Sequence, residues 1–286
     1  MTFRSMEIFQ AVVENKSMQA AARILFISVP SVSEVISDLE EEFNQKLFER
    51  LNHKLFITPS GQRLYDYVTR ILNLQRELQQ QMNSENSVHA LRIGATVSIG
   101  SSIIFPILQK AKPLNANVII NNTKNIEEKL LRNELDIALV EGKIHNKYLI
   151  SKPLVEDELV VACNPLHPFS GQESVSWAEL ESCPLLVREE GSGTREKLTE
   201  AFEKNGIKPN IQWESSCINA IIKAVSDGLG VTVISKRLIS AELKTLKIDG
   251  FDGKRMFSLV WHKDKYFSDA MEGFITACYQ FSKEEN

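Results

Sequence analysis

Short polar side chains that could read DNA bases gather on one face of a predicted helix near the N-terminus. They are Ser31, Ser33, Glu34 and Ser37. A hydroxyl can donate to or accept from a base edge, and a carboxylate accepts hydrogen bonds, so this set has the chemistry of direct readout in the major groove. The same residues would also suit the solvated face of an ordinary helix, because amphipathic helices occur in any helical domain.

Two helices joined by a tight turn would position this polar face. Ser17 and Ser28 are typical N-cap residues, and Pro30 falls in the first turn of the second helix, where its missing N–H costs little. Apolar residues on that helix recur at spacings of four, three and four, at Val32, Ile36, Leu39 and Phe43. Asn44 then suits a left-handed C-terminal residue. Together with a first helix over residues 4–15, the pattern predicts a helix-turn-helix.

A hairpin wing is predicted after these helices, over residues 46–58. Residues 52–53 mark its turn, and its basic side chains Lys46, Arg50 and Lys54 are placed to meet phosphates. The charge balance opposes DNA binding. The first 60 residues carry six basic and eight acidic side chains, a net charge of −2, and the whole chain has a formal net charge of −4.

A long amphipathic helix is predicted from Pro59 to about Met82, with Thr58 as its N-cap. A seven-residue apolar repeat runs along this helix. It consists of Leu64, Val68, Ile71, Leu78 and Met82, with Gln75 as a polar interruption. Such a stripe must be covered, and a second copy of the same helix is the simplest cover. The alternative is that the stripe packs on its own domain.

The remainder of the chain follows a polar boundary segment, residues 83–89, and alternates strands with helices. A strand at 91–95 and a helix at 102–111 open this pattern, which indicates βαβ units and a mainly parallel sheet. The pattern crosses into a second lobe near 164–169 and returns near 257–261, leaving a ligand cleft between the lobes. The expected domains are a DNA-binding domain at 1–58, a linker helix and hinge at 59–88, and a two-lobed domain at 89–286, with lobes at 89–163 plus 265–286 and at 164–264.

Composition argues against several other classes of protein. No pair among the four cysteines has C-x-x-C spacing and no histidine cluster joins them, so no metal site is expected. No apolar run approaches the ~18 residues of a membrane span. The N-terminus lacks the apolar core of a signal peptide, so a cytoplasmic protein without membrane contact is expected. No spacing suggests a nucleophile–base pair, so neither catalytic residues nor a cofactor are expected.

The chain resembles the LysR-type transcriptional regulators along essentially its whole length. The motifs that carry the resemblance are AAARIL at 20–25, S-x-P-S-V-S at 28–33, I-S-D-L-E at 36–40, LFER at 47–50 and T-P-S-G at 58–61, with weaker marks LRIGA at 91–95, DIAL at 136–139 and GLGV at 228–231. The resemblance implies an N-terminal all-α winged helix-turn-helix and an α/β two-lobed periplasmic-binding-protein-like effector domain. It also implies double-stranded DNA and a small-molecule effector as partners, and self-association as a homodimer or homotetramer.

Two positions depart from the family's DNA-reading pattern. Members often carry Gln where this chain has Val29, and Arg or Lys where it has Glu34. Val29 could contact a thymine methyl group, and Glu34 could accept a hydrogen bond from cytosine N4. The expected DNA contacts are Ser28, Val29, Ser31, Ser33, Glu34, Ser37, Arg50 and Lys54. Redox-sensing members place a cysteine near residues 191–195, and its absence here argues against peroxide sensing.

The segment Arg188–Arg195 resembles the REpGSGTR stretch of members that govern sulfur assimilation and carbon fixation. Glycines ahead of a helix place unpaired N–H groups and a positive dipole end together, which suits an anion, although an ordinary capped turn has the same pattern. Ligands of α/β sheets bind beyond the carboxyl ends of the strands. The expected effector contacts are Thr96, Ser98, Ser101, Glu141, Ser192, Thr194 and Arg195. The effector should be anionic, and Glu141 would favour one that also carries an amine.

A competing function is an enzyme or solute-binding protein on the two-lobed fold, with the N-terminal helices serving only as a dimerisation arm. Solute capture outside the membrane would need an export signal, and catalysis would need reactive groups at a suitable spacing. The sequence offers neither, so a ligand-responsive DNA-binding regulator is the favoured interpretation.

Overall fold

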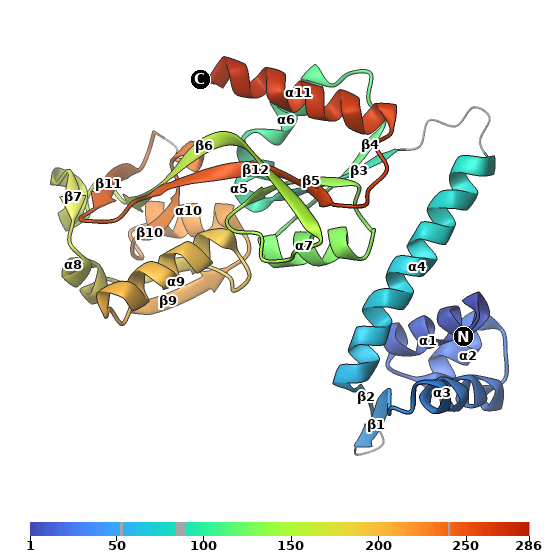
Figure 1. Ribbon diagram of the computed structural model, residues 1–286. Coiled ribbons are helices and arrows are strands. Elements are labelled where there is room, and N and C mark those ends of the chain that lie inside the picture. Colours follow the sequence, from blue (N-terminus) through green and yellow to red (C-terminus); the bar gives the residue numbers. More distant parts are fainter. Residues whose placement is uncertain (52–53, 84–89, 240, 286) are drawn as a thin grey trace. The chain divides into compact units, whose positions relative to one another are not determined.

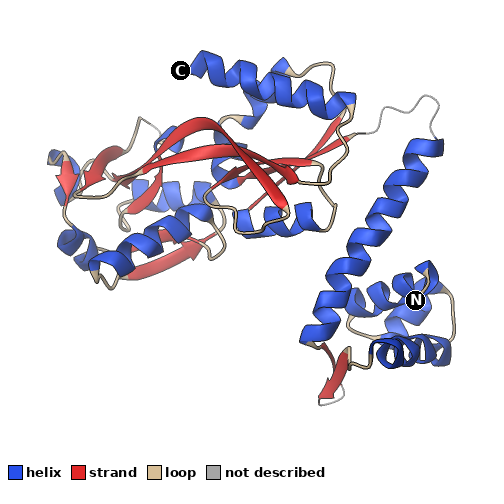
Figure 2. Ribbon diagram, in the orientation of Figure 1, coloured by secondary structure: helices blue, strands red, loops and turns tan. Residues whose placement is uncertain are grey.

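The computed structural model describes residues 1–51, 54–83, 90–239 and 241–285. The chain divides into two compact units. The first comprises Met1–Ser87 and Leu131–Glu134, and the second comprises Val88–Leu130 and Leu135–Asn286. The first is mostly helical, whereas the second mixes helices with strands (Figures 1 and 2). Most of the predicted boundary segment at 83–89 lies outside the described residues.

Three capped helices form the head of the first unit. They are α1 (Phe3–Asn15), α2 (Met18–Leu25) and α3 (Val29–Phe43). A hydroxyl at each N-cap accepts a hydrogen bond from a first-turn amide; these caps are Thr2, Ser17 and Ser28. Each helix ends in a left-handed residue, at Lys16, Phe26 and Asn44. The predicted caps at Ser17, Ser28 and Asn44 are therefore confirmed.

The wing is a two-stranded antiparallel hairpin of β1 (Phe48–Leu51) and β2 (Lys54–Ile57), with Arg50 opposite Leu55. Leu47, just before β1, is buried with Phe9, Val32 and Leu39 in the core of the first unit. This packing ties the hairpin to the helices. The predicted turn at residues 52–53 lies outside the described residues.

Helix α4 (Pro59–Asn83) follows the wing and has Thr58 as its N-cap, whose Oγ1 accepts a hydrogen bond from the Gly61 amide at 3.0 Å. The predicted pairing stripe divides along this helix. Val68 is fully buried in the core of its own unit, and Leu64 and Ile71 pack against that core. The pairing role predicted for Val68 is wrong, because α4 uses this part of the stripe to cover the helix-turn-helix.

The exposed apolar side chains on α4 overlap only in part with the predicted stripe. Leu78 and Met82 are exposed to 59% and 76%, as predicted for a seam, and Tyr67 and Leu74 are exposed beside them. Residues 67, 74 and 78 lie seven and four apart, which places them along one face of a helix. The free apolar face of α4 is therefore rotated relative to the predicted stripe.

The second unit is built on an eight-stranded sheet. Its order is β4–β3–β5–β12–β6–β11–β7, and β10 also pairs with β6. The first-lobe strands β3 (Leu91–Thr96), β4 (Ala116–Asn121) and β5 (Ile137–Glu141) are parallel. The expected mainly parallel sheet is wrong for the middle of the sheet, where β12 pairs antiparallel with β5 and β6, although β7 and β11 are again parallel. β6 (Leu149–Cys163) and β12 (Lys254–His262) are antiparallel, because the chain leaves the first lobe along one and returns along the other.

Helices cover both faces of the first lobe (Figure 1). They are α5 (Val97–Ser102), α6 (Ile104–Lys110) and α11 (Asp269–Glu285), with α7 (Thr123–Leu131) on the opposite face. Ile99, Ile103 and Ile107 are buried at spacings of four, so the helical pattern starts earlier than the predicted residue 102. Gly94 lets α7 approach the sheet, since a Cβ there would lie 3.2 Å from Ile126 and 2.7 Å from Leu135 side-chain atoms.

The second lobe contains elements that the sequence did not predict as well as those it did. Its elements are η1 (Pro168–Gly171), β7 (Ser174–Val175), α8 (Trp177–Ser182), β8 (Leu185–Arg188), α9 (Gly193–Asn205), β9 (Ile211–Ser215), α10 (Ile218–Ser226), β10 (Thr232–Ser235), η2 (Lys236–Leu238) and β11 (Lys244–Ile248). The alternating pattern predicts strands at 184–187, 211–214 and 231–234 and helices after Gly193 and at 218–226. The elements η1, β7, α8, η2 and β11 were not predicted, because they are short or carry no clear period.

One lobe boundary lies within β6 and the other between Phe251 and Phe257, not at the predicted 163/164 and 264/265. Val155 belongs to the core of the first lobe and Leu159 to that of the second, while Phe257 belongs again to the first. β6 thus contributes to both cores, whereas β12 contributes to the core of the first lobe. Among the described residues no single helix is long and apolar enough to span a membrane; α2 and α3 pass that test only as a pair, bent by 113°.

Candidate nucleic-acid interface and buried polar cluster

The predicted DNA-reading face of α3 is exposed. Ser31, Ser33, Glu34 and Ser37 are all solvent-accessible, while Val32, Ile36 and Leu39 are buried against α1, α2 and the wing. Ser28 has a structural role instead. Its hydroxyl accepts a hydrogen bond from the Ser31 amide at 3.2 Å and forms a second one with the Ser31 hydroxyl at 2.8 Å. Ser28 therefore fixes the start of the helix.

A surface groove joins this face to the wing and to the start of α2. Its lining residues are Lys16, Ser17, Met18, Gln19, Val29, Ser33, Arg50, Lys54 and Leu55. Lys16, Arg50 and Lys54 bring three positive charges to one groove although the unit as a whole is acidic. Their clustering answers the charge objection, because phosphate binding depends on local charge.

The basic residues of the wing are not equivalent. Lys46 forms an ion pair with Glu40, whose other oxygen accepts from the amides of Leu47 and Phe48 at 2.9 and 3.3 Å. Burial works to raise the pKa of Glu40, but these hydrogen bonds outweigh it and hold that pKa below its ordinary value. Arg50 makes only a 3.5 Å hydrogen bond to the Met18 sulfur, and Lys54 has no ion-pair partner within the described residues.

A cluster of buried polar groups lies where β6 and β12 pass between the lobes, and we call it the Arg255 cluster. Its members are Ser98, Glu141, Asp157, Thr194 and Arg255. Arg255 donates from Nε to Asp157 Oδ2 at 2.7 Å, from Nη1 to Thr194 Oγ1 at 2.9 Å and from Nη2 to Ser98 Oγ at 3.4 Å. Its Nη2 also lies 3.3 Å from Glu141 Oε2. Arg255 and Asp157 are directly opposed across the two strands.

Four buried polar atoms, one on Glu141 and three on residues close to Ser98 or Thr194 in sequence, have no hydrogen-bond partner among the described residues. They are Thr96 Oγ1, Glu141 Oε2, Ser192 Oγ and Arg195 Nη1. Thr96 and Ser192 stand at helix N-caps, yet neither side chain makes a capping bond. Both are essentially fully buried, so each retains a hydrogen bond for another group. Ser101, predicted as a contact, is exposed.

The turn before α9 closes the second lobe onto the first. The Gly193 amide donates to Thr123 Oγ1 at 3.1 Å, and this hydroxyl donates to the Glu141 carbonyl at 3.1 Å. The Lys124 amide donates to the Gly191 carbonyl at 3.1 Å. A Cβ at Gly193 would lie 2.5 Å from the Glu141 carbonyl oxygen, so only glycine permits this approach. The predicted segments after β3, after β5 and before α9 therefore meet.

Comparison with known proteins identifies the family. Residues 3–62 match the family described as bacterial regulatory helix-turn-helix protein, lysR family, and residues 84–282 match the LysR substrate binding domain. The chain belongs to the LysR family. It is 34% identical to the HTH-type transcriptional regulator CysL of Bacillus subtilis over 271 residues, which is 91% of each chain. It is also 29% identical to the RuBisCO operon transcriptional regulator of Allochromatium vinosum over 96% of this chain and 94% of that one.

Solved LysR structures share the fold. Full-length CbnR complexed with target DNA superposes with a TM-score of 0.65 over 99% of this chain and all of CbnR, at 18% identity. The CcmR regulatory domain of Synechocystis PCC6803, solved in complex with 2-PG, has a TM-score of 0.63 and 25% identity over 68% of this chain and 97% of that one. This LysR family member is thus a DNA-binding transcriptional regulator with an effector-binding domain.

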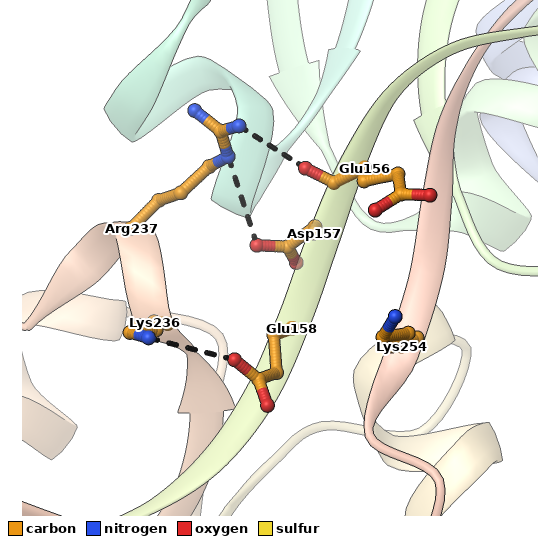
Figure 3. Close-up of a pocket in the computed structure, with 6 residues that line it drawn as sticks. All are labelled: Glu156, Asp157, Glu158, Lys236, Arg237 and Lys254. Atoms are coloured by element: carbon orange, nitrogen blue, oxygen red, sulfur yellow. Dashed lines mark hydrogen bonds and ion pairs between the residues drawn. The ribbon is translucent and has the colours of Figure 1, made fainter. Parts of the chain in front are cut away.

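A small pocket of this regulator lies where β6 crosses between the lobes, and it shares Asp157 with the Arg255 cluster. Figure 3 shows Arg237 of η2 pointing toward the crossing part of β6. Its Nη2 donates to the Glu156 carbonyl at 3.1 Å and its Nε lies 3.9 Å from Asp157 Oδ1, which also accepts from Ser235 at 2.6 Å. Arg237 also pairs with Glu285 of α11. Asp157 therefore contacts Arg255 with its Oδ2, and Ser235 and Arg237 with its Oδ1.

Arg255 and Asp157 were missed by sequence reasoning. Asp157 stands between Glu156 and Glu158, and Arg255 follows Lys254, so no local spacing distinguishes either one from its charged neighbours. In the described part of the LysR chain, no group of three or more His, Cys, Asp or Glu side chains could hold a metal ion. Its cysteines are free thiols, and burial raises the pKa of Cys163 and Cys278 above the ordinary range.

Proposed function

We propose that this LysR regulator reads an operator with α3 and grips the phosphates with its wing. The observation that carries the proposal is the single groove that joins Val29 and Ser33 of α3 to Arg50 and Lys54 of the wing. The proposed reading set is Val29, Ser31, Ser33, Glu34 and Ser37. The site of action is then the cytoplasm, where the DNA lies, and no enzymatic role is needed.

We further propose the domain division predicted from sequence, with residues 1–58 as the DNA-binding domain, 59–88 as linker helix and hinge, and the remainder as the effector domain. Two copies would join through the exposed face of α4, at Tyr67, Leu74, Leu78 and Met82, with Ile71 at its edge. Pairing brings two recognition helices to two half-sites, and tetramers would add a second pair.

The effector site is proposed at the Arg255 cluster. Buried hydroxyls without partners at Thr96 and Ser192, beside Ser98, Thr194 and Arg195, support binding of a small acidic molecule. The segment Arg188–Arg195 supports placing the chain with LysR members that carry a GSGTR stretch. The CcmR regulatory domain, solved in complex with 2-PG, is consistent with a small anionic effector.

The test is a quantitative gel shift with the DNA upstream of the chain's own reading frame. Replacing Lys54 by Ala should weaken specific and random DNA alike and lower the salt slope by about one unit, because one phosphate contact is lost. Replacing Ser33 by Ala should weaken the specific site by about 1 kcal/mol while random DNA is unaffected. Lys208→Ala, an equal charge change at an exposed site in the second unit, is the control. Unchanged binding by both variants would refute the assignment.

A further inference from the structure

The charge balance of the Arg255 cluster is unusual for a site that takes an anion. Arg255 faces two carboxylates, Asp157 and Glu141, with N–O distances of 2.7 and 3.3 Å. All three side chains are almost fully buried, with exposures of 4% for Arg255, 0% for Asp157 and 1% for Glu141. Arg237 faces the other oxygen of Asp157, with its Nε 3.9 Å from Oδ1. Two carboxylates thus face two guanidinium groups, and the cluster has no positive charge left over for an anion.

The guanidinium of Arg255 is also committed to protein partners. Each of its three nitrogens donates to an oxygen of Ser98, Asp157 or Thr194, and Nη2 is shared with Glu141. Glu141 also accepts from the Thr194 hydroxyl at 3.4 Å through its Oε1. The Glu141 carboxylate thus stands beside Arg255 where the acidic group of a ligand would otherwise lie.

The atoms left without partners define what a ligand must offer. Glu141 Oε2 lies 3.3 Å from Arg255 Nη2 but accepts no hydrogen bond among the described residues, so it is open to a donor. Arg195 Nη1 is a donor without an acceptor among the described residues. The Thr96 and Ser192 hydroxyls can serve either way. A bare oxyanion such as sulfate supplies acceptors only, and it would bring like charge against Glu141 in a buried site where Coulomb repulsion is strong.

We propose that Glu141 is the specificity-determining residue of the effector site. It selects a small molecule that carries a hydrogen-bond donor, a hydroxyl or an ammonium group, next to its acidic group. The donor satisfies Glu141 Oε2 and the acidic group reaches Arg195 and the two free hydroxyls. Glu141 excludes sulfate and similar inorganic oxyanions. This inference rests on the proposed effector site and adds the class of molecule that it accepts.

The experiment is calorimetric titration of the full-length protein with sodium sulfate, in the wild type and in Glu141→Gln. The substitution keeps the side-chain shape and leaves Arg255 paired with Asp157, so the guanidinium is not stranded. Removing the repelling charge should improve sulfate affinity at least about tenfold. Glu196→Gln is the matched control, since it removes an equal charge from an exposed first-turn position of α9 that pairs with His145, and it should leave sulfate affinity unchanged.

Two results would overturn the proposal. One is equal sulfate affinity in the wild type and Glu141→Gln, whether both bind or neither does, because Glu141 would then not be what excludes the ion. The other is wild-type binding of sulfate below millimolar concentration, which decides the matter even if the variant fails to fold. Gel shifts on the same preparations test the proposed function separately. If the wild type does not bind the operator, the proposed function is refuted, whereas the sulfate comparison still stands.

Discussion

Glu40 holds the recognition helix and the wing in one geometry, so a single carboxylate bears on how the protein meets DNA. Replacing Glu40 by Gln should destabilise the first unit by about 1–3 kcal/mol, since the bonds to Lys46, Leu47 and Phe48 are charge-assisted. Urea denaturation at neutral pH measures this loss. Glu41→Gln, at the neighbouring exposed position, is the control and should be close to neutral.

The effect of this substitution should depend on pH with a defined sign. Folding lowers the pKa of Glu40, so its contribution is complete above the ordinary value of 4.5 and is lost as the pH falls through the lowered folded value. The gap in unfolding free energy between the wild type and Glu40→Gln should therefore shrink below pH 4.5. A gap that is constant over this range would mean that ionised Glu40 does not stabilise the fold.

At the same scale, sequence reasoning found residues whose position follows from local rules and missed those set by tertiary pairing. Ser98 and Thr194 were placed near a ligand because they follow strand ends, and the structure brings them to one arginine. Arg255 and Asp157 are far apart in sequence, and it is the register of β6 against β12 that brings them together. A strand partner so distant in sequence leaves no periodic signal.

Among the elements, α4 offers the clearest test of assembly, because its free face consists of Leu74 and Leu78 with Tyr67 and Met82. Replacing Leu74 and Leu78 together by Asp should place charge in the seam between two copies and dissociate them. Light scattering should then report a smaller particle, and operator affinity should fall because the two half-sites are no longer bound together. Gln79→Asp, at a neighbouring exposed position, should keep the oligomer.

Val68 supplies the contrasting outcome on the same helix. Because it is fully buried in its own unit, Val68→Asp should unfold the helix-turn-helix as well as abolish DNA binding. The heptad pattern predicted the helix correctly, and Thr58-Pro59 predicted its N-cap. The pattern included Leu78 and Met82 of the exposed face but not Tyr67 and Leu74. The pattern could not show which apolar residues face the domain core and which face a second copy. Residues in both positions recur with a period near 3.5 residues.

For the two-lobed unit as a whole, closure depends on the absence of a side chain at one position. Replacing Gly193 by Ala would press a methyl group onto the Glu141 carbonyl, 2.5 Å away, and should part the lobes there. Hydrogen exchange should accelerate at the amides of Gly193 and Lys124, which bond across this contact. Gly273→Ala on α11, where nothing lies within 4 Å, should not change the exchange. Unaltered protection in Gly193→Ala would show that the contact is not held in solution.

The double crossing of the chain also sets an order on its synthesis. The core of the second lobe draws on one continuous stretch, from Leu159 to Phe251, and can form as soon as that stretch has left the ribosome. The first lobe has to wait, because Phe257 and Leu259 of β12 and Met271 and Phe274 of α11 complete its core. During translation β3, β4 and β5 are therefore made early but must wait for β12 and α11. The second lobe can already be folded by that time. The first lobe is the part of a nascent regulator that a chaperone has most reason to protect.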